Sequence, residues 1–129
     1  MIAFLSGPVL AFRKDCAIVK SGDVGYQVFL TQIALARLSG HPGQASYWIY
    51  EHIREDSHTL FGFNTLPELE GFEALLSVRG LGPKLALKAL SSATFEQIVK
   101  LAKAGDVDGL CELDGIGART AEALCEEFS

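Results

Sequence analysis

The chain has 129 residues and a net charge of −5, and 49% of its residues are hydrophobic and 21% are charged. These values are typical of a folded protein and exclude a disordered chain, and the length allows one ordinary domain or two small ones. The negative charge disfavours a nucleic-acid partner unless basic residues are clustered, because phosphates attract Lys and Arg. The whole excess lies in residues 64–129, which carry six basic and eleven acidic residues (6 − 11 = −5).

The cysteines and the N-terminal residues indicate in which cellular compartment the protein is expected. Cys16, Cys111 and Cys125 are odd in number and form no CxxC pair, which argues against a zinc site or a disulfide framework. The apolar start "MIAFLSGPVLAF" has no basic segment before it and is interrupted by Gly7-Pro8, unlike a signal peptide. No segment has the roughly 18 apolar residues that a membrane span needs. We therefore expect a cytoplasmic protein with buried thiols and no membrane partner.

Residues 1–63 are expected to form a small β-barrel. Short runs rich in Val, Ile, Tyr and Phe alternate with turn residues, which is typical of strands. The expected strands cover residues 1–12, 16–20, 24–30, 45–53 and 58–63, with a helix at 31–39, a loop at 41–44 and a turn at 54–57. Five or six short strands with one helix favour an OB-type barrel.

From residue 64 onward the apolar pattern becomes helical. Expected start signals are the capping-box pairs Thr65 with Glu68 and Thr94 with Gln97, the N-cap Asp106, and Pro83 at a first helical position. The expected helices run from 65 to about 78, from about 83, from 94 to about 105, from 107 to 113 and from about 118 to 128. The predicted fold class is therefore α+β: an OB-fold barrel at 1–63, then an all-helical domain at 64–129.

The helical half contains one short pattern twice, 35 residues apart (115 − 80): Gly80-Leu81-Gly82 and Gly115-Ile116-Gly117. Glycine accepts positive φ and leaves its amide uncovered. A helix that begins directly afterwards has first N–H groups without intrahelical acceptors, and its dipole favours anions. Each turn is followed by a cation, Lys84 or Arg119. The pattern predicts two contacts to a phosphate backbone, which carry no sequence information.

A plain αα-hairpin, in which glycine only ends a helix, is the alternative interpretation of either copy. Two copies that share glycines, a preceding aliphatic residue and a cation favour phosphate binding. Asp114 precedes the second turn, and Ala118 stands where the first copy has Pro83, so weaker phosphate binding is expected at the second turn. Basic residues around the first turn are expected to be Arg79, Lys84 and Lys88. The residues expected to bind DNA are Arg79, Gly80, Leu81, Gly82, Lys84, Lys88, Gly115, Ile116, Gly117 and Arg119.

The turn Arg54-Glu55-Asp56-Ser57 joins two apolar strands. An ordinary solvated turn is its simplest interpretation. Beside DNA, the two carboxylates would instead repel phosphates. A third interpretation makes His52, Glu55, Asp56 and His58 the metal ligands of a nuclease, with the two histidines facing each other across the hairpin.

The tandem hairpins, together with "GDVGYQV", "REDSHTLFGF", "GLGPKLALKALS" and "LDGIGARTAEAL", resemble the RuvA family of Holliday-junction-binding proteins over essentially the whole chain. The resemblance implies a non-catalytic subunit that holds a four-way DNA junction open for branch migration by an ATP-driven motor, in recombination, repair and the SOS response. It also implies a homotetramer, or a stacked octamer, that works with a RuvB-like hexameric ATPase and a RuvC-like resolvase. Glu55 and Asp56 would then form the acidic pin at the crossover.

The family has a third, motor-binding domain after a flexible linker, and this sequence ends at Ser129, where that linker is expected to begin. The sequence therefore corresponds either to a shortened chain or to a protein without that domain. No Walker A sequence is present, so ATP hydrolysis is assigned to a partner, and no cofactor or metal is expected. Two other functions stay open: a helix-hairpin-helix nuclease or lyase module, and a protein scaffold with no DNA role.

Overall fold

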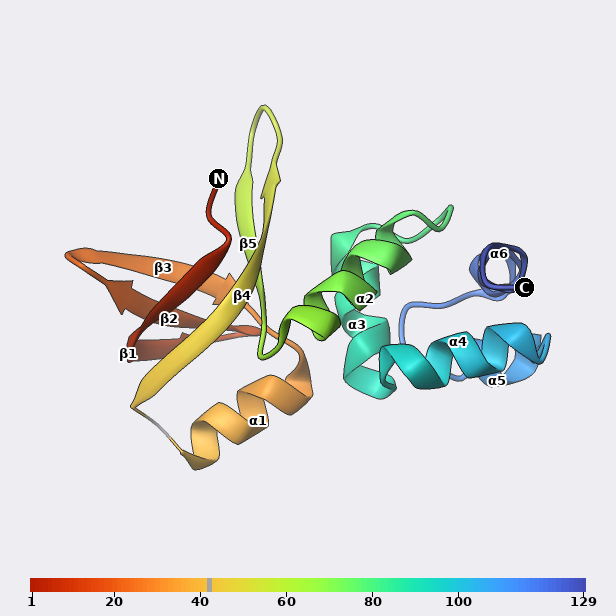
Figure 1. The fold of residues 1–129 in the computed structure, drawn as a ribbon, viewed down its shortest axis with the longest axis horizontal. Coiled ribbons are helices and arrows are strands. Elements are labelled where there is room, and N and C mark those ends of the chain that lie inside the picture. Colours follow the sequence, from red (N-terminus) through yellow and green to blue (C-terminus); the bar gives the residue numbers. More distant parts are fainter. Residues whose placement is uncertain (42) are drawn as a thin grey trace. The chain divides into compact units, whose positions relative to one another are not determined.

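The computed structural model describes residues 1–41 and 43–129, so that Pro42, within the loop expected at 41–44, lies outside the described residues. The chain divides into two compact units, Met1–Leu69 and Glu70–Ser129 (Figure 1). The helix α2 (Leu66–Leu76) begins in the first unit and ends in the second.

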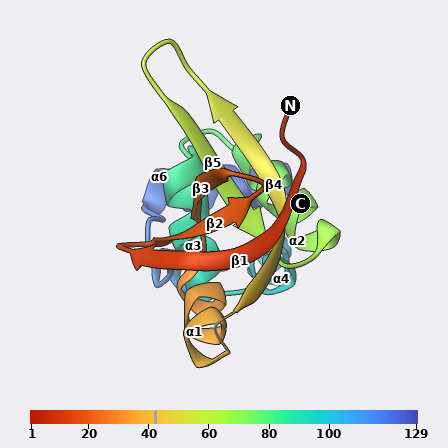
Figure 2. The same ribbon diagram turned by 90° about the vertical axis from the view of Figure 1, so that its left-hand side faces the viewer.

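The first unit is a closed five-stranded barrel that confirms the expected OB-type fold. Its strands are β1 (Phe4–Arg13), β2 (Cys16–Ser21), β3 (Val24–Phe29), β4 (Gln44–Ile53) and β5 (His58–Phe63), and α1 (Gln32–Gly40) joins β3 to β4. The strand order is β1-β2-β3-β5-β4. The pairing of β3 with β5 is parallel and every other pairing is antiparallel. Figure 2 shows β1 curving across the barrel to reach both β2 and β4.

Alternation along the strands fills the barrel interior. In β4, Ala45, Tyr47 and Ile49 are buried, and residues between them face outward. The buried cluster comprises Leu5, Ala17, Val19, Val28, Leu30, Ala34, Leu38, Ala45, Tyr47, Ile49 and Leu60. A bulge between Val9 and Ala11 shifts the register of β1 against β2, which bends a strand that must serve two neighbours.

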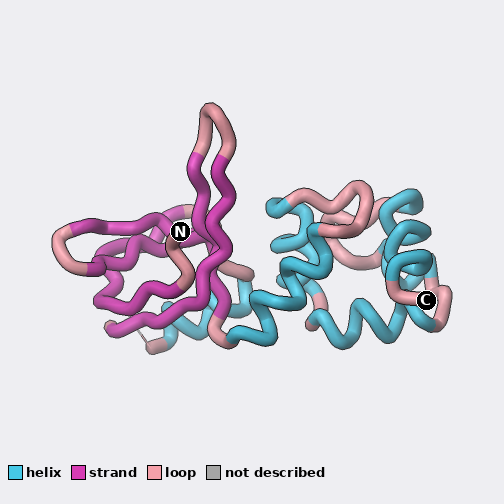
Figure 3. The backbone as a smooth tube through the Cα atoms, turned by 45° about the horizontal axis from the view of Figure 1, so that its top comes forward, coloured by secondary structure: helices cyan, strands magenta, loops and turns pink. Residues whose placement is uncertain are grey.

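The strands β4 and β5 continue beyond the rest of the barrel as a two-stranded hairpin (Figures 1 and 3). Their antiparallel register runs from Trp48 opposite Phe63 to Ile53 opposite His58. The expected turn at 54–57 therefore forms the tip of a projecting hairpin.

The second unit contains α3 (Pro83–Ser92), α4 (Phe95–Lys103), α5 (Val107–Cys111), α6 (Ala118–Glu127) and most of α2. Side chains that pack completely inside it include Phe72, Leu75, Ile98, Leu110 and Leu124. None of the described helices combines the length and the apolar character that a membrane crossing requires.

Most of the expected helix starts are confirmed. Thr94 and Gln97 form both hydrogen bonds of a capping box, and Asp106 Oδ1 accepts from the Gly109 N–H at 2.9 Å. Thr65 contributes one half of its expected box, accepting from the Glu68 N–H at 3.3 Å.

The two helices that precede the glycine turns end earlier than expected. The helix α2 stops at Leu76 instead of about residue 78, and α5 stops at Cys111 instead of residue 113. In each case the following residues form tight i to i−3 hydrogen bonds, which turn the chain into the glycine motif. The early ends are therefore part of the repeated turns.

Candidate nucleic-acid interface

The two glycine turns have the same backbone conformation. Gly80 and Gly115 have φ of +94° and +83°, in the region that side chains with a Cβ rarely adopt. Gly82 and Gly117 are extended, with φ of −86° and −97°. The backbone conformation therefore requires glycine only at the first glycine position of each motif.

The same hydrogen bonds hold both turns. The Leu81 N–H donates to the Val78 carbonyl at 3.1 Å, and the Ile116 N–H donates to the Leu113 carbonyl at 3.3 Å. The side chains of Leu81 and Ile116 are buried. Their buried side chains anchor the two turns to the interior of the second unit.

The helices that follow the turns begin without side-chain caps. Gly82 and Gly117 occupy the N-cap positions of α3 and α6, and neither helix has a capping side-chain hydrogen bond. By contrast, α1, α4 and α5 are capped by the side chains of Thr31, Thr94 and Asp106. Uncapped first-turn N–H groups at the positive end of a helix dipole are the donors that bind anions.

The free donors can be assigned along each helix. The first bonds inside α3 and α6 run from Ala86 N–H to the Gly82 carbonyl and from Ala121 N–H to the Gly117 carbonyl, both at 2.9 Å. The preceding N–H groups have no acceptor within the described part of the chain. They belong to Lys84 and Leu85 in α3, and to Ala118, Arg119 and Thr120 in α6.

The two turns pack against each other's helices. A Cβ placed on Gly80 would lie 2.8 Å from the Thr120 Oγ1 in α6. A Cβ placed on Gly115 would lie 3.2 Å from the Leu85 carbonyl oxygen in α3. The two sets of free N–H groups therefore belong to one packed arrangement within the second unit.

The basic residues near the turns are available to a ligand. Arg79, Lys84, Lys88 and Arg119 are exposed, and none makes an ion pair with a residue that the structure describes. Lys88 was expected beside the first turn, but its Cβ lies 3.5 Å from a Cβ placed on Gly115 in the second. The second turn therefore has a basic neighbour from α3 as well as the acidic Asp114, whose N–H donates to Ser92 Oγ at 3.3 Å.

The acidic tip of the β4–β5 hairpin is exposed. The Arg54 N–H donates to the Ser57 carbonyl at 2.8 Å and closes the turn. The side chains of Glu55 and Asp56 form no ion pair with any described residue. The tip thus presents two carboxylates that no neighbouring cation neutralises.

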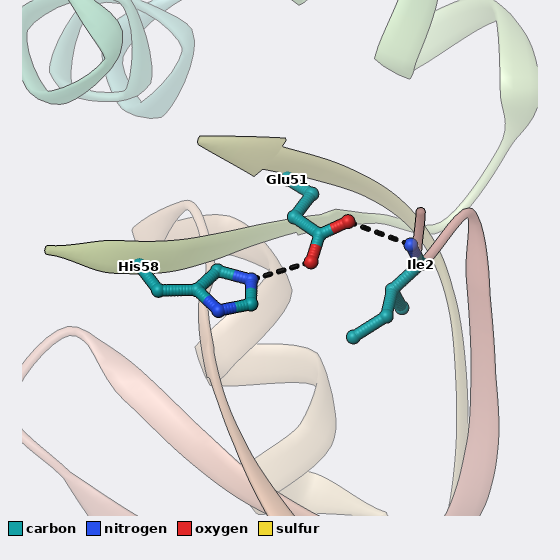
Figure 4. A network of polar contacts seen from close by, with 3 residues as sticks. All are labelled: Ile2, Glu51 and His58. Atoms are coloured by element: carbon teal, nitrogen blue, oxygen red, sulfur yellow. Dashed lines mark hydrogen bonds and ion pairs between the residues drawn. The ribbon is translucent and has the colours of Figure 1, made fainter. Parts of the chain in front are cut away.

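A polar contact network stabilises the hairpin near its tip (Figure 4). The Glu51 side chain is only 5% exposed, and its two oxygens contact the Ile2 N–H, at 2.7 Å, and His58 Nε2. The Ile2 N–H lowers the pKa of Glu51, with a smaller contribution from His58, because both favour the carboxylate. Glu51 therefore ties the N-terminal segment to both strands of the hairpin.

The facing of His52 and His58 that the alternative metal-site interpretation requires is not observed. In the observed register His52 lies opposite Thr59, whereas His58 lies opposite Ile53, so the two imidazoles are on opposite faces of the hairpin. The described residues also contain no group of three or more His, Cys, Asp or Glu that could hold a metal ion. The metal-ligand interpretation of this hairpin is thereby not supported.

Sequence reasoning missed three contributors to these sites: Glu51, Ser92 and Thr120. Each acts on a residue far away in the chain, at separations of 49 for Glu51 and 22 for Ser92. The 35-residue repeat is the one sequence signal that points to any of them, because it places Thr120 at the position of Leu85, near the start of the equivalent helix.

Comparison with known proteins gives the same description of both units. Residues 1–62 match the family model "RuvA N terminal domain", and residues 72–129 match "SAM-like Helix-hairpin-helix tandem". The chain is similar to proteins named "Holliday junction branch migration complex subunit RuvA". It is 42% identical to the one from Deinococcus radiodurans over 130 residues, 37% to the one from Solibacter usitatus over 128, and 36% to the one from Thermoanaerobacter sp. strain X514 over 128.

The aligned regions cover 99–100% of this chain. They cover 64% of the Deinococcus protein, 65% of the Solibacter protein and 68% of the Thermoanaerobacter protein. The chain thus spans about two thirds of the length of these relatives.

Proposed function

Because the chain belongs to the RuvA family, we propose that it is a non-catalytic, structure-selective DNA-binding subunit. It holds four-way junctions open while a partner ATP-driven motor moves the branch point, in recombination and DNA repair. The activity is that for which the relatives are named, and it is transferred to this chain, which spans about two thirds of their length.

The observation that carries the proposal is the pair of uncapped helix N-termini after the repeated glycine turns. Their free N–H groups bind phosphate oxygens, while Lys84 and Arg119 supply the charge that draws phosphates to the site. Arg79 and Lys88 are the further proposed contacts. Recognition through the backbone explains how the subunit selects DNA by shape and remains indifferent to base sequence.

The tip carboxylates select against other DNA shapes. Glu55 and Asp56 repel phosphates that approach the hairpin tip, an effect that weakens with distance and salt. A continuous duplex would bring its phosphates close to such a tip, whereas an opened junction centre would leave room for it. Glu55 and Asp56 are therefore proposed as the acidic pin.

The proposed assembly is a homotetramer, in which four copies offer one pair of glycine turns to each arm of a junction; two tetramers could stack as an octamer.

The proposed partners are a RuvB-like hexameric ATPase and a RuvC-like resolvase, in the cytoplasm. The proposed domains are the barrel at 1–63 and the tandem hairpins at 64–129.

A gel-shift comparison tests the proposal. A labelled four-way junction and a linear duplex of the same sequence are titrated with the protein at several salt concentrations, and the mass of the complex is measured by light scattering. Tighter binding to the junction, with affinity that falls steeply as salt rises, supports the proposal. Equal affinity for both DNAs overturns it. Cleavage of either DNA on addition of a divalent cation would instead support the nuclease alternative, and no binding at any salt would support the scaffold.

A further inference from the structure

Arg54 lies next to the two tip carboxylates but is bonded to a different residue. Its Nε donates to His52 Nε2 at 2.9 Å, back along β4. It forms no ion pair with Glu55 or Asp56 among the described residues. A guanidinium beside a carboxylate commonly forms a charge-assisted hydrogen bond. The contact with His52 instead holds the guanidinium back along β4, where it forms no ion pair with the two carboxylates among the described residues.

His52 is held in place for this contact. Its ring stacks on Tyr50, two residues earlier on the same face of β4, with centroids 6.2 Å apart and planes at 24°. An arginine Nε can only donate, so the accepting Nε2 of His52 carries no proton. In this contact the His52 ring therefore accepts the hydrogen bond through Nε2.

The other charged groups of the hairpin lie apart from this pair. Glu51 and His58 contact each other, and the β4–β5 register places them on the opposite face from His52. Across from His52 on β5 stands Thr59, which is uncharged. The contact between His52 and Arg54 can therefore be changed without disturbing the Glu51 network.

We propose that His52 is a positioning residue for DNA selectivity: by holding the Arg54 guanidinium, it keeps Glu55 and Asp56 un-neutralised at the hairpin tip. The inference rests on the proposed function, because it deepens the role of the tip in choosing junctions over duplex. Without His52, Arg54 is free to pair with either adjacent carboxylate, and an ion-paired carboxylate repels an approaching phosphate less than an unpaired one. Duplex phosphates then meet less repulsion.

A double-mutant cycle isolates this role. Affinities for a four-way junction and for a duplex are measured for the parent, His52→Ala, Arg54→Gln and the double variant. His52→Ala is expected to reduce the junction-to-duplex affinity ratio about two- to fivefold, the size of a surface charge pair. Arg54→Gln keeps both tip charges, and adding His52→Ala to it is expected to change nothing. His52→Gln, whose carbonyl oxygen accepts a hydrogen bond, should restore most of the parent ratio.

Two results would overturn the inference while leaving the proposed function intact. In the first, the parent prefers junctions and the His52→Ala variant has the same junction-to-duplex affinity ratio as the parent. The other is an equal loss of selectivity with and without Arg54, which would mean that His52 acts independently of the guanidinium.

A measurement without DNA separates the inference from the proposed function. ¹⁵N NMR of the parent should show a coupling between Arg54 Nε and His52 Nε2 across their hydrogen bond, and the chemical shifts of a His52 protonated on Nδ1. Absence of the coupling, or a proton on Nε2, overturns the inference directly. A parent with the coupling but no preference for junctions overturns the proposed function, and with it the selectivity role of His52.

Discussion

Gly80 in the first glycine turn lies directly against Thr120 in the helix of the second, so closely that a Cβ on Gly80 would be 2.8 Å from the Thr120 Oγ1. The reverse contact joins Gly115 to Leu85. The 35-residue repeat relates Gly80 to Gly115 and Leu85 to Thr120, so each contact joins the first glycine of one hairpin to the equivalent position of the other. The two hairpins are therefore joined by a nearly symmetric contact, and a side chain added at either glycine affects both.

Gly80→Ala is expected to destabilise the protein by roughly 1 to 3 kcal/mol, because alanine at φ +94° is strained and its Cβ meets Thr120. Urea denaturation measures the loss. Gly82→Ala is the matched control: its φ is −86° and no heavy atom lies within 4 Å of an added Cβ, so a change within about 0.5 kcal/mol is expected. Adding Thr120→Ala to Gly80→Ala should recover the part of the lost unfolding free energy that comes from the contact between the new Cβ and Thr120. Equal losses at Gly80 and Gly82 would show that neither φ nor Thr120 matters.

Lys84→Gln and Arg119→Gln should each reduce the salt dependence of junction binding by about one unit in the slope of log affinity against log salt. The physical reason is that each removes a cation that neutralises a phosphate. Lys103→Gln is the control, since Lys103 lies in the last turn of α4, where a cation complements the helix dipole. Slopes that are unchanged in all three variants would rule out side-chain phosphate contacts at the turns.

The double substitution Glu55→Gln with Asp56→Asn should strengthen duplex binding more than junction binding, because it removes the repulsion at the tip. The expected effect shrinks as salt rises, since exposed charges are screened. Competition between labelled junction and unlabelled duplex at low and high salt provides the measurement. A junction preference that is the same in the parent and the double variant would leave the two carboxylates with no part in selectivity.

Glu51 predicts a loss of stability in acid. Its pKa is lowered in the folded protein by the Ile2 N–H and by His58, whereas in the unfolded chain a glutamate has a pKa of about 4.3. Its contribution is therefore complete above about pH 4.3 and is lost as the pH falls through the lowered folded value. Urea midpoints across an acidic pH series should show this loss in the parent and less of it in Glu51→Gln. Glu55→Gln, which alters an exposed carboxylate without an ion-pair partner among the described residues, should retain the parent's profile.

The thiols should differ in reactivity. Cys16 is 1% exposed, and burial raises the pKa of its thiol, so little reactive thiolate is present in the folded protein. Cys111 is exposed on α5 and Cys125 is half-buried, so the expectation that the thiols are buried is wrong for these two. Alkylation followed by mass spectrometry should modify Cys111 first and Cys16 only when the barrel opens. Modification of Cys16 as fast as Cys111 in the native protein would contradict the buried position.

Local chemistry accounts for what the sequence predicted well. Alternating apolar residues gave the strands, and the capping residues Thr94 and Asp106 gave two helix starts, because these signals act within a few residues. The glycine turns were found by their own repetition. The parallel closure of β3 on β5 was not visible, since it depends on which strands meet after folding.

Relations across strands and between hairpins could not be predicted from the sequence. The sequence left open whether His52 and His58 face each other, because a shift of one residue in register reverses the face of every side chain, and the observed register places them on opposite faces. Lys88 follows the first turn in sequence yet lies beside Gly115 of the second. No local pattern encodes either relation.

The proposed phosphate contacts are main-chain N–H groups, which remain as donors through almost any substitution of side chains. Proline is the exception, because it has no N–H. Pro83 holds the first helical position after the first turn, where the second turn has Ala118, so the second turn has one additional donor. Most side-chain substitutions around both turns would therefore leave the donors in place, whereas Gly80 and Gly115 are required by their positive φ. Relatives with little side-chain similarity in this region would still offer the same atoms to an anion.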